Sequence, residues 1–77
     1  MKIEVFAQLK EHFDKTFHVP SGIRNIQSLK EHLAAGRPEL ISVLESCRFA
    51  VDDEFIDNNH QLNENDSISI IPPSSGG

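Results

Sequence analysis

The apolar residues of this 77-residue chain recur with a period of two near both ends and with a helical period in the middle. Residues 2–9 alternate, and one set of side chains points to a single side: Ile3, Val5, Ala7 and Leu9. Residues 16–19 alternate again before the turn signal Pro20-Ser21-Gly22. We therefore expect two antiparallel strands joined by a five-residue connection at residues 10–14.

A helical stripe follows this turn, formed by Ile26, Leu29 and Leu33. Asn25 is placed to cap its first turn, Gly36 is suited to its end, and Pro38 can open a second short helical segment. The period of two then returns at residues 48–51, 55–56 and 67–71. This order predicts an α+β fold of two layers, in which the first and last long strands pair inside a mixed sheet and one helix crosses over one face.

The other face of this sheet is expected to be uncovered. Phe6, Ala50 and Ile71 are each out of phase with the core residues of their strands, so they should gather on that face. An exposed apolar patch on a small protein is usually a docking surface, and the alternative is that a loop or the C-terminal tail covers it. We therefore predict a partner-binding patch on a single domain over residues 1–71.

Composition and charge exclude several classes of function. Twelve acidic and seven scattered basic residues give a net charge of −5, which argues against a nucleic-acid partner. The sequence shows neither a leader nor an apolar run long enough for a membrane, and its single Cys47 cannot form an internal disulfide. A cytoplasmic protein without membrane association is therefore expected, with Cys47 as a packing residue. The four histidines lack the spacing of a metal site, so no metal is predicted.

The last six residues form a distinct segment, Pro72-Pro73-Ser74-Ser75-Gly76-Gly77. Two prolines end the sheet and favour an extended, flexible tail, and six extended residues reach roughly 20 Å, enough to enter a partner's cleft. Glycine has no Cβ, so Gly76 and Gly77 can pass a constriction that blocks other residues. A carboxylate needs activation before acyl chemistry, most simply as an acyl-adenylate made from ATP. We predict that residues 72–76 bind partners and that Gly77 is the reactive residue.

Several segments follow the pattern of one known family: Val5-Phe6-Ala7-Gln8-Leu9, Phe49-Ala50-Val51, Leu62 with Asp66-Ser67-Ile68, and the ending Ile70-Ile71-Pro72-Pro73-Ser74-Ser75-Gly76-Gly77. The whole chain resembles the MoaD-type small subunits of molybdopterin synthase, which are ubiquitin-like β-grasp sulfur carriers. The Pro-Pro spacer before Gly-Gly is the most specific feature. Asp52 departs from the pattern, because the family often has Asn at this position.

This resemblance implies a reaction cycle centred on Gly77. An adenylating enzyme similar to ubiquitin-activating enzymes would use ATP to convert the carboxylate into an acyl-adenylate, and a sulfur donor would displace AMP to leave a thiocarboxylate. The charged carrier would then dock on the large synthase subunit, in an expected heterotetramer, and pass its sulfur to a cyclic pterin precursor to form the molybdopterin dithiolene. The carrier itself would hold no permanently bound cofactor, and the catalytic residues would belong to the large subunit.

Three other functions are compatible with the residues. A carrier for thiamin or thiolated-tRNA synthesis would use the same fold, although the Pro72-Pro73 spacer argues against a thiamin carrier. A protein modifier or plain interaction module would instead end in an amide between Gly77 and a lysine. A stand-alone metal enzyme is disfavoured by the absence of ligand spacing and by the small size of the chain.

Overall fold

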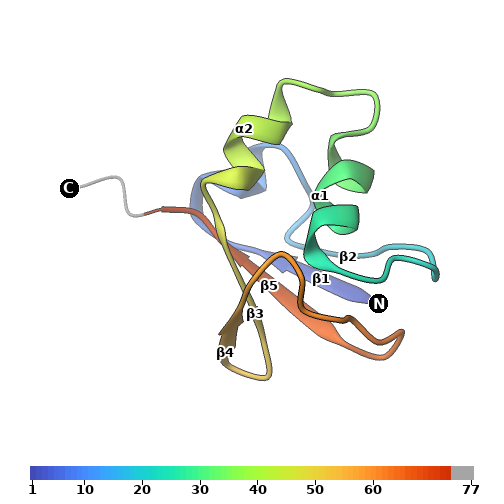
Figure 1. Ribbon diagram of the computed structural model, residues 1–77. Helices are drawn as coiled ribbons and strands as arrows, with labels where there is room; N and C mark the ends of the chain where they lie inside the picture. Colours follow the sequence, from blue (N-terminus) through green and yellow to red (C-terminus); the bar gives the residue numbers. More distant parts are fainter. Residues whose placement is uncertain (74–77) are drawn as a thin grey trace.

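The computed structural model describes residues 1–73 and contains one five-stranded sheet with both α-helices on the same side of it (Figure 1). In chain order the elements are β1 (Lys2–Val5), the 3-10 helix η1 (Ala7–Glu11), β2 (Thr16–His18), α1 (Ile26–Ala34), α2 (Leu40–Glu45), β3 (Arg48–Val51), β4 (Glu54–Ile56) and β5 (Ser67–Ile71).

The first and last strands pair at the centre of the sheet, as predicted. The strand order is β2-β1-β5-β3-β4, with β1 and β5 parallel and the other neighbours antiparallel. The parallel register places Ile3 beside Ile68 and Val5 beside Ile70. These four side chains are buried and face the helical layer, so the predicted α+β fold with a mixed sheet is confirmed.

The helical layer begins and ends where the sequence predicted. The side-chain oxygen of Asn25 accepts a 2.8 Å hydrogen bond from the backbone N–H of Ser28, and Gly36 lies just beyond the end of α1 with φ of 81°. The stripe of α1 packs into the core together with Leu40 and Leu44 of α2. The layer therefore contains two α-helices, the longer of which is the predicted crossover helix.

The strand predicted over residues 2–9 was wrong beyond Val5. Ala7 adopts a left-handed conformation with φ of 53° and is exposed, and the chain then turns through η1. One turn of 3-10 helix still brings Leu9 into the core, which is why its apolar character suggested a longer strand. The connection to β2 consequently spans residues 6–15 instead of the five predicted.

Among residues 1–73, no helix combines the length and the apolar character that crossing a membrane requires.

Candidate docking surface

The sheet face that points away from the helices is divided into a polar part and an apolar end. Residues directly opposite one another in register share a face. One row across the sheet is therefore formed by Thr16, Glu4, Ser69, Ala50 and Phe55, and the row on its polar side by His18, Lys2 and Ser67. The row on the other side contains Ile71 and Arg48, which are direct partners in the β3–β5 ladder.

Phe6 extends this last row. It is extended, with φ of −129° and ψ of 160°, and it follows Val5, whose partner in β5 is Ile70. Continuing the parallel register by one residue places Phe6 beside Ile71. Phe6 is 37% exposed and Ile71 is half-buried. We call this end of the face the tail-side patch and define it as Phe6, Arg48, Ala50, Phe55 and Ile71.

Ala50 lies in the middle of this patch, although it is only 8% exposed. Its partners in register are Ser69 on one side and Phe55 on the other, and these larger side chains shield it. Its strand neighbours Phe49 and Val51 belong to the core cluster on the helical side, whereas Ala50 does not. The three residues predicted from their phase therefore share the outer face.

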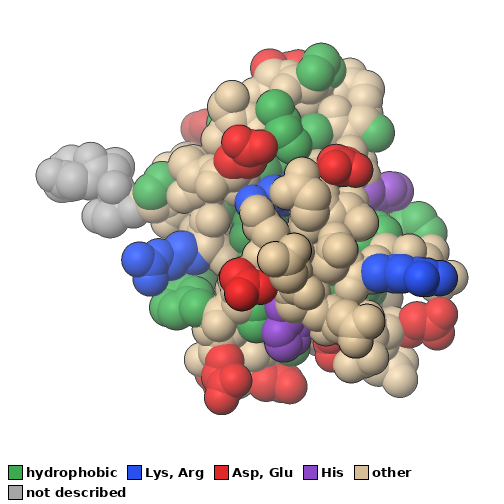
Figure 2. Space-filling view, in the orientation of Figure 1, with side chains coloured by type: hydrophobic (Ala, Val, Ile, Leu, Met, Phe, Trp, Pro, Cys, Tyr) green, Lys and Arg blue, Asp and Glu red, His purple; other side chains and the backbone are tan. Residues whose placement is uncertain are grey.

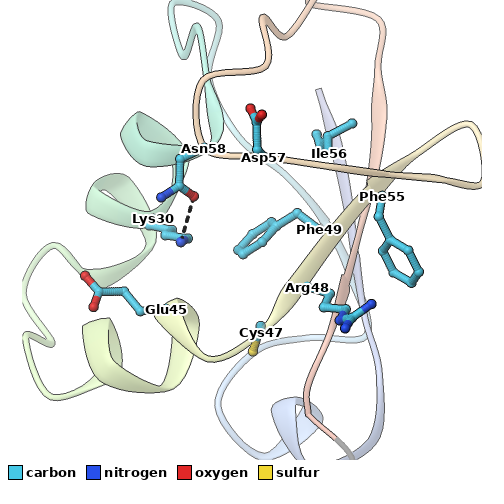
Figure 3. A pocket seen from close by; sticks show the side chains of 9 residues that line it. All are labelled: Lys30, Glu45, Cys47, Arg48, Phe49, Phe55, Ile56, Asp57 and Asn58. Atoms are coloured by element: carbon cyan, nitrogen blue, oxygen red, sulfur yellow. Dashed lines mark hydrogen bonds between the residues drawn. The ribbon is translucent and has the colours of Figure 1, made fainter.

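Phe55 and Arg48 are patch residues that the sequence did not single out. Phe55 is 61% exposed, and the guanidinium carbon of Arg48 lies 5.2 Å from the centroid of its ring. Figure 3 shows both side chains on the side of β3 opposite Phe49 and Lys30. The pairing of Phe55 with Ala50 across a two-residue turn was the signal that could have placed Phe55 on this face.

The predicted tail begins at this patch. Pro72 is half-buried, Pro73 is exposed, and neither continues β5, in keeping with the missing N–H of proline. The predicted partner-binding residues Ser74, Ser75 and Gly76 and the predicted reactive residue Gly77 lie outside the described residues.

A pocket of about 400 Å³ lies beside β3 and β4 (Figure 3). Its lining includes Lys30, Cys47 and Phe49 on the helical side of the sheet and also the patch residues Arg48 and Phe55. Burial raises the pKa of the Cys47 thiol above its ordinary value of 9.0, and the Lys30 ammonium opposes this effect only in part. The thiol donates to the backbone oxygen of Val43 at 3.1 Å, so Cys47 is a protonated packing residue, as predicted, and not an activated nucleophile.

The histidines are dispersed and exposed: His12, His18, His32 and His60. Figure 2 shows histidine side chains at separate places on one face of the molecule. Within residues 1–73, no group of three or more histidine, cysteine or acidic side chains is arranged to hold a metal ion.

Comparison with known proteins identifies the family. The model of the ThiS family matches residues 3–77. The chain belongs to the ThiS family. Two relatives are both named molybdopterin synthase sulfur carrier subunit. The Chlamydomonas reinhardtii protein is 32% identical over 82 residues, which cover 100% of this chain and 98% of that protein. The Dictyostelium discoideum protein is 37% identical over 81 residues, covering 99% and 94%. The resemblance to molybdopterin synthase small subunits is thereby confirmed.

Solved structures confirm the β-grasp fold of this ThiS-family chain. SAMP1 from Haloferax volcanii superimposes with a TM-score of 0.79 at 20% identity, covering 99% of this chain and 97% of that one. A protein-protein complex of subunits 1 and 2 of molybdopterin-converting factor from Helicobacter pylori contains a chain with a TM-score of 0.67 at 26% identity, covering 99% and 96%. In that complex, a β-grasp chain similar to this one is assembled with a second subunit.

Proposed function

We propose that this protein is the sulfur-carrier small subunit of molybdopterin synthase. The observation that carries the proposal is the Pro72-Pro73 segment, which leaves the sheet directly after β5 and leads to Gly76-Gly77. Two full-length relatives named for the same role support it. The protein would act in the cytoplasm, in keeping with its free, buried Cys47.

The chemistry proposed for Gly77 consists of two charging steps followed by sulfur transfer. Its carboxylate attacks the α-phosphorus of ATP in an adenylating enzyme similar to ubiquitin-activating enzymes, so that pyrophosphate leaves and an acyl-adenylate forms. A sulfur donor then supplies hydrosulfide, which attacks the acyl carbon and displaces AMP to give the thiocarboxylate. The thiocarboxylate sulfur finally bonds to a carbon of a cyclic pterin precursor in the large subunit, displacing an oxygen substituent, and water hydrolyses the resulting thioester to release the Gly77 carboxylate. Two such transfers supply the two sulfurs of the molybdopterin dithiolene. The small chain supplies the reactive end and its partners supply the catalytic residues.

The tail-side patch is the proposed docking surface for the large subunit. It exposes the aromatic rings of Phe6 and Phe55 at the end of the sheet where Pro72 begins. Docking through this patch would direct residues 72–77 toward the partner's active site, since six extended residues reach roughly 20 Å. The assembly of subunits 1 and 2 in the Helicobacter pylori complex supports a large-subunit partner. We propose that this chain and its large subunit assemble as a heterotetramer.

Intact-mass measurement tests the proposed chemistry. The chain, with an untagged C-terminus, is co-expressed with its adenylating enzyme and a sulfur donor, and the thiocarboxylate is detected as one oxygen replaced by one sulfur. The chain without Gly77 is the control, because it should fold equally well and acquire no sulfur. If the sulfur-bearing species is absent although the adenylating enzyme is active, the proposal is wrong.

A second assay separates this function from its alternatives. Charged protein mixed with the large synthase subunit should convert the cyclic pterin precursor into molybdopterin. A carrier for thiamin or thiolated-tRNA synthesis would charge with sulfur but fail in this assay. A protein modifier would instead give Gly77-dependent conjugates on denaturing gels.

A further inference from the structure

We propose that Arg48 recognises a carboxylate on the surface of the large subunit and that this ion pair sets the position of the tail-side patch on its partner. This inference rests on the proposed function and adds the chemistry of the partner surface. That surface would present an acidic side chain surrounded by apolar ones.

The position of Arg48 links it to the tail. Arg48 is the direct partner of Ile71 in the β3–β5 ladder, and Ile71 is the last residue before Pro72. A contact made by Arg48 therefore fixes the end of β5 from which the tail begins. Lys2, by contrast, pairs with Ser67 at the opposite end of β5.

The Arg48 side chain is held beside the exposed ring of Phe55. Its guanidinium carbon lies 5.2 Å from the ring centroid, which is a cation–π contact. Because the aromatic ring is not a hydrogen-bond acceptor comparable to a carboxylate, the planar fork of N–H groups still has capacity for an anion. In residues 1–73 these N–H groups form no ion pair with an acidic side chain. The edge matches the two oxygens of a carboxylate.

The surroundings of Arg48 favour an anion on the partner once the patch is covered. The other four patch residues are apolar, and although Glu45 and Asp57 line the same pocket as Arg48, neither forms an ion pair with it within residues 1–73. Docking would therefore remove water from the guanidinium without replacing its hydrogen bonds. An unpaired buried charge is costly, and a carboxylate with two acceptor oxygens compensates for it. The chain carries a net charge of −5, which repels acidic surfaces in general. An acidic partner residue is therefore favourable next to Arg48 and unfavourable over most of the remaining surface.

The test measures the affinity of the full chain, with Gly77 ending in an ordinary carboxylate, for the large subunit at about 0.05 M and about 0.3 M salt. Arg48→Gln should weaken binding by about tenfold or more at low salt and make affinity less sensitive to salt. Arg48→Lys keeps the positive charge but loses the planar fork of N–H groups, so its affinity should lie between that of the wild type and that of Arg48→Gln. Lys2→Gln is the matched control, because it removes one positive charge from the polar part of the same face and should change affinity by less than about twofold.

The outcomes separate this inference from the proposed function. If Arg48→Gln binds as tightly as the wild type with the same salt dependence, while Phe6→Glu weakens binding, the role of Arg48 is wrong and docking through the patch stands. If neither substitution weakens binding, docking through the patch is wrong as well. If Arg48→Glu loses binding and regains it with a large subunit in which one interface acid is changed to lysine, the carboxylate is identified and the inference holds.

Discussion

The Lys30 ammonium donates a 2.9 Å hydrogen bond to the side-chain oxygen of Asn58, which joins α1 to the loop after β4 (Figure 3). Lys30 is only 4% exposed, and its Nζ atom lies 5.4 Å from the centroid of the Phe49 ring. In residues 1–73 this ammonium forms no ion pair with a carboxylate. The amide oxygen and the aromatic ring therefore replace part of the hydration that the charge loses on burial.

This arrangement predicts that Asn58→Ala is more destabilising than Lys30→Met. Asn58→Ala removes the acceptor and leaves the buried charge in place, which should lower the free energy of unfolding by about 2 kcal/mol. Lys30→Met removes the charge and keeps an unbranched apolar side chain, so the expected loss is under about 1 kcal/mol. Urea unfolding of each variant measures the difference.

Glu31→Ala is the control for these two variants. Glu31 lies next to Lys30 on α1 but is exposed, and its only side-chain hydrogen bond within residues 1–73 is a surface contact of 3.3 Å from Gln27. Its loss should change the free energy of unfolding by less than about 0.5 kcal/mol. A larger loss for Lys30→Met than for Asn58→Ala would contradict this account of the buried charge.

The β3–β4 turn predicts a stabilising substitution. Asp52 and Asp53 both have left-handed backbones, with φ of 52° and 65°, between the paired residues Val51 and Glu54. Asn and Gly are favoured in such two-residue turns. The double change Asp52→Asn with Asp53→Gly should raise the free energy of unfolding by about 0.5 to 1 kcal/mol. As a control, Asp14→Gly should lower the free energy of unfolding. Asp14 does not have a positive φ, so glycine relieves no strain there and only adds freedom to the unfolded chain. An Asn-Gly variant that melts below the wild type would disprove the prediction.

Cys47 predicts a loss of stability at alkaline pH. Because burial raises the pKa of its thiol, the unfolded chain releases this proton at a lower pH than the folded chain does. The stability from the buried neutral thiol is therefore complete below pH 9.0, the ordinary pKa, and is lost as the pH rises through the folded-state pKa. Urea unfolding at about pH 7 to 10 should show a steeper decline for the wild type than for Cys47→Ala. Identical pH dependence of the two proteins would rule out this role for the thiol.

The fold was predictable where burial and period agree. The core side of β1 and β5 alternates with polar residues because its side chains are buried under the helices: Ile3, Val5, Ile68 and Ile70. The ends of α1 were recognisable from Asn25 and Gly36, because these residue types are favoured at helix ends. The same periodicity predicted that the first strand continues to Leu9, whereas it ends at Val5, because a buried leucine fits a 3-10 turn as well as a strand. Periodicity therefore predicts which residues are buried more reliably than it predicts their backbone conformation.

The docking surface was predictable only in part. Phe6, Ala50 and Ile71 are visible from the sequence because each breaks the alternation of its own strand. Phe55 is not, because in the short segment Phe55-Ile56 both residues are apolar and neither is out of phase. Its place on the outer face depends on the register with Ala50, and the place of Arg48 depends on the register with Ile71. Both pairings are properties of the folded sheet.

Phe55 gives a prediction that depends on the β3–β4 register. Phe55→Ser should weaken binding to the large subunit by about tenfold or more, because serine would not make the contacts that the exposed aromatic ring is proposed to make with the partner. The thermal midpoint of the isolated chain should hardly change, since Phe55 is 61% exposed. Ser67→Glu, on the polar part of the same face beside Lys2, is the matched control and should leave binding nearly unchanged. If Ser67→Glu weakens binding and Phe55→Ser does not, the partner binds the polar part of the sheet instead of the tail-side patch.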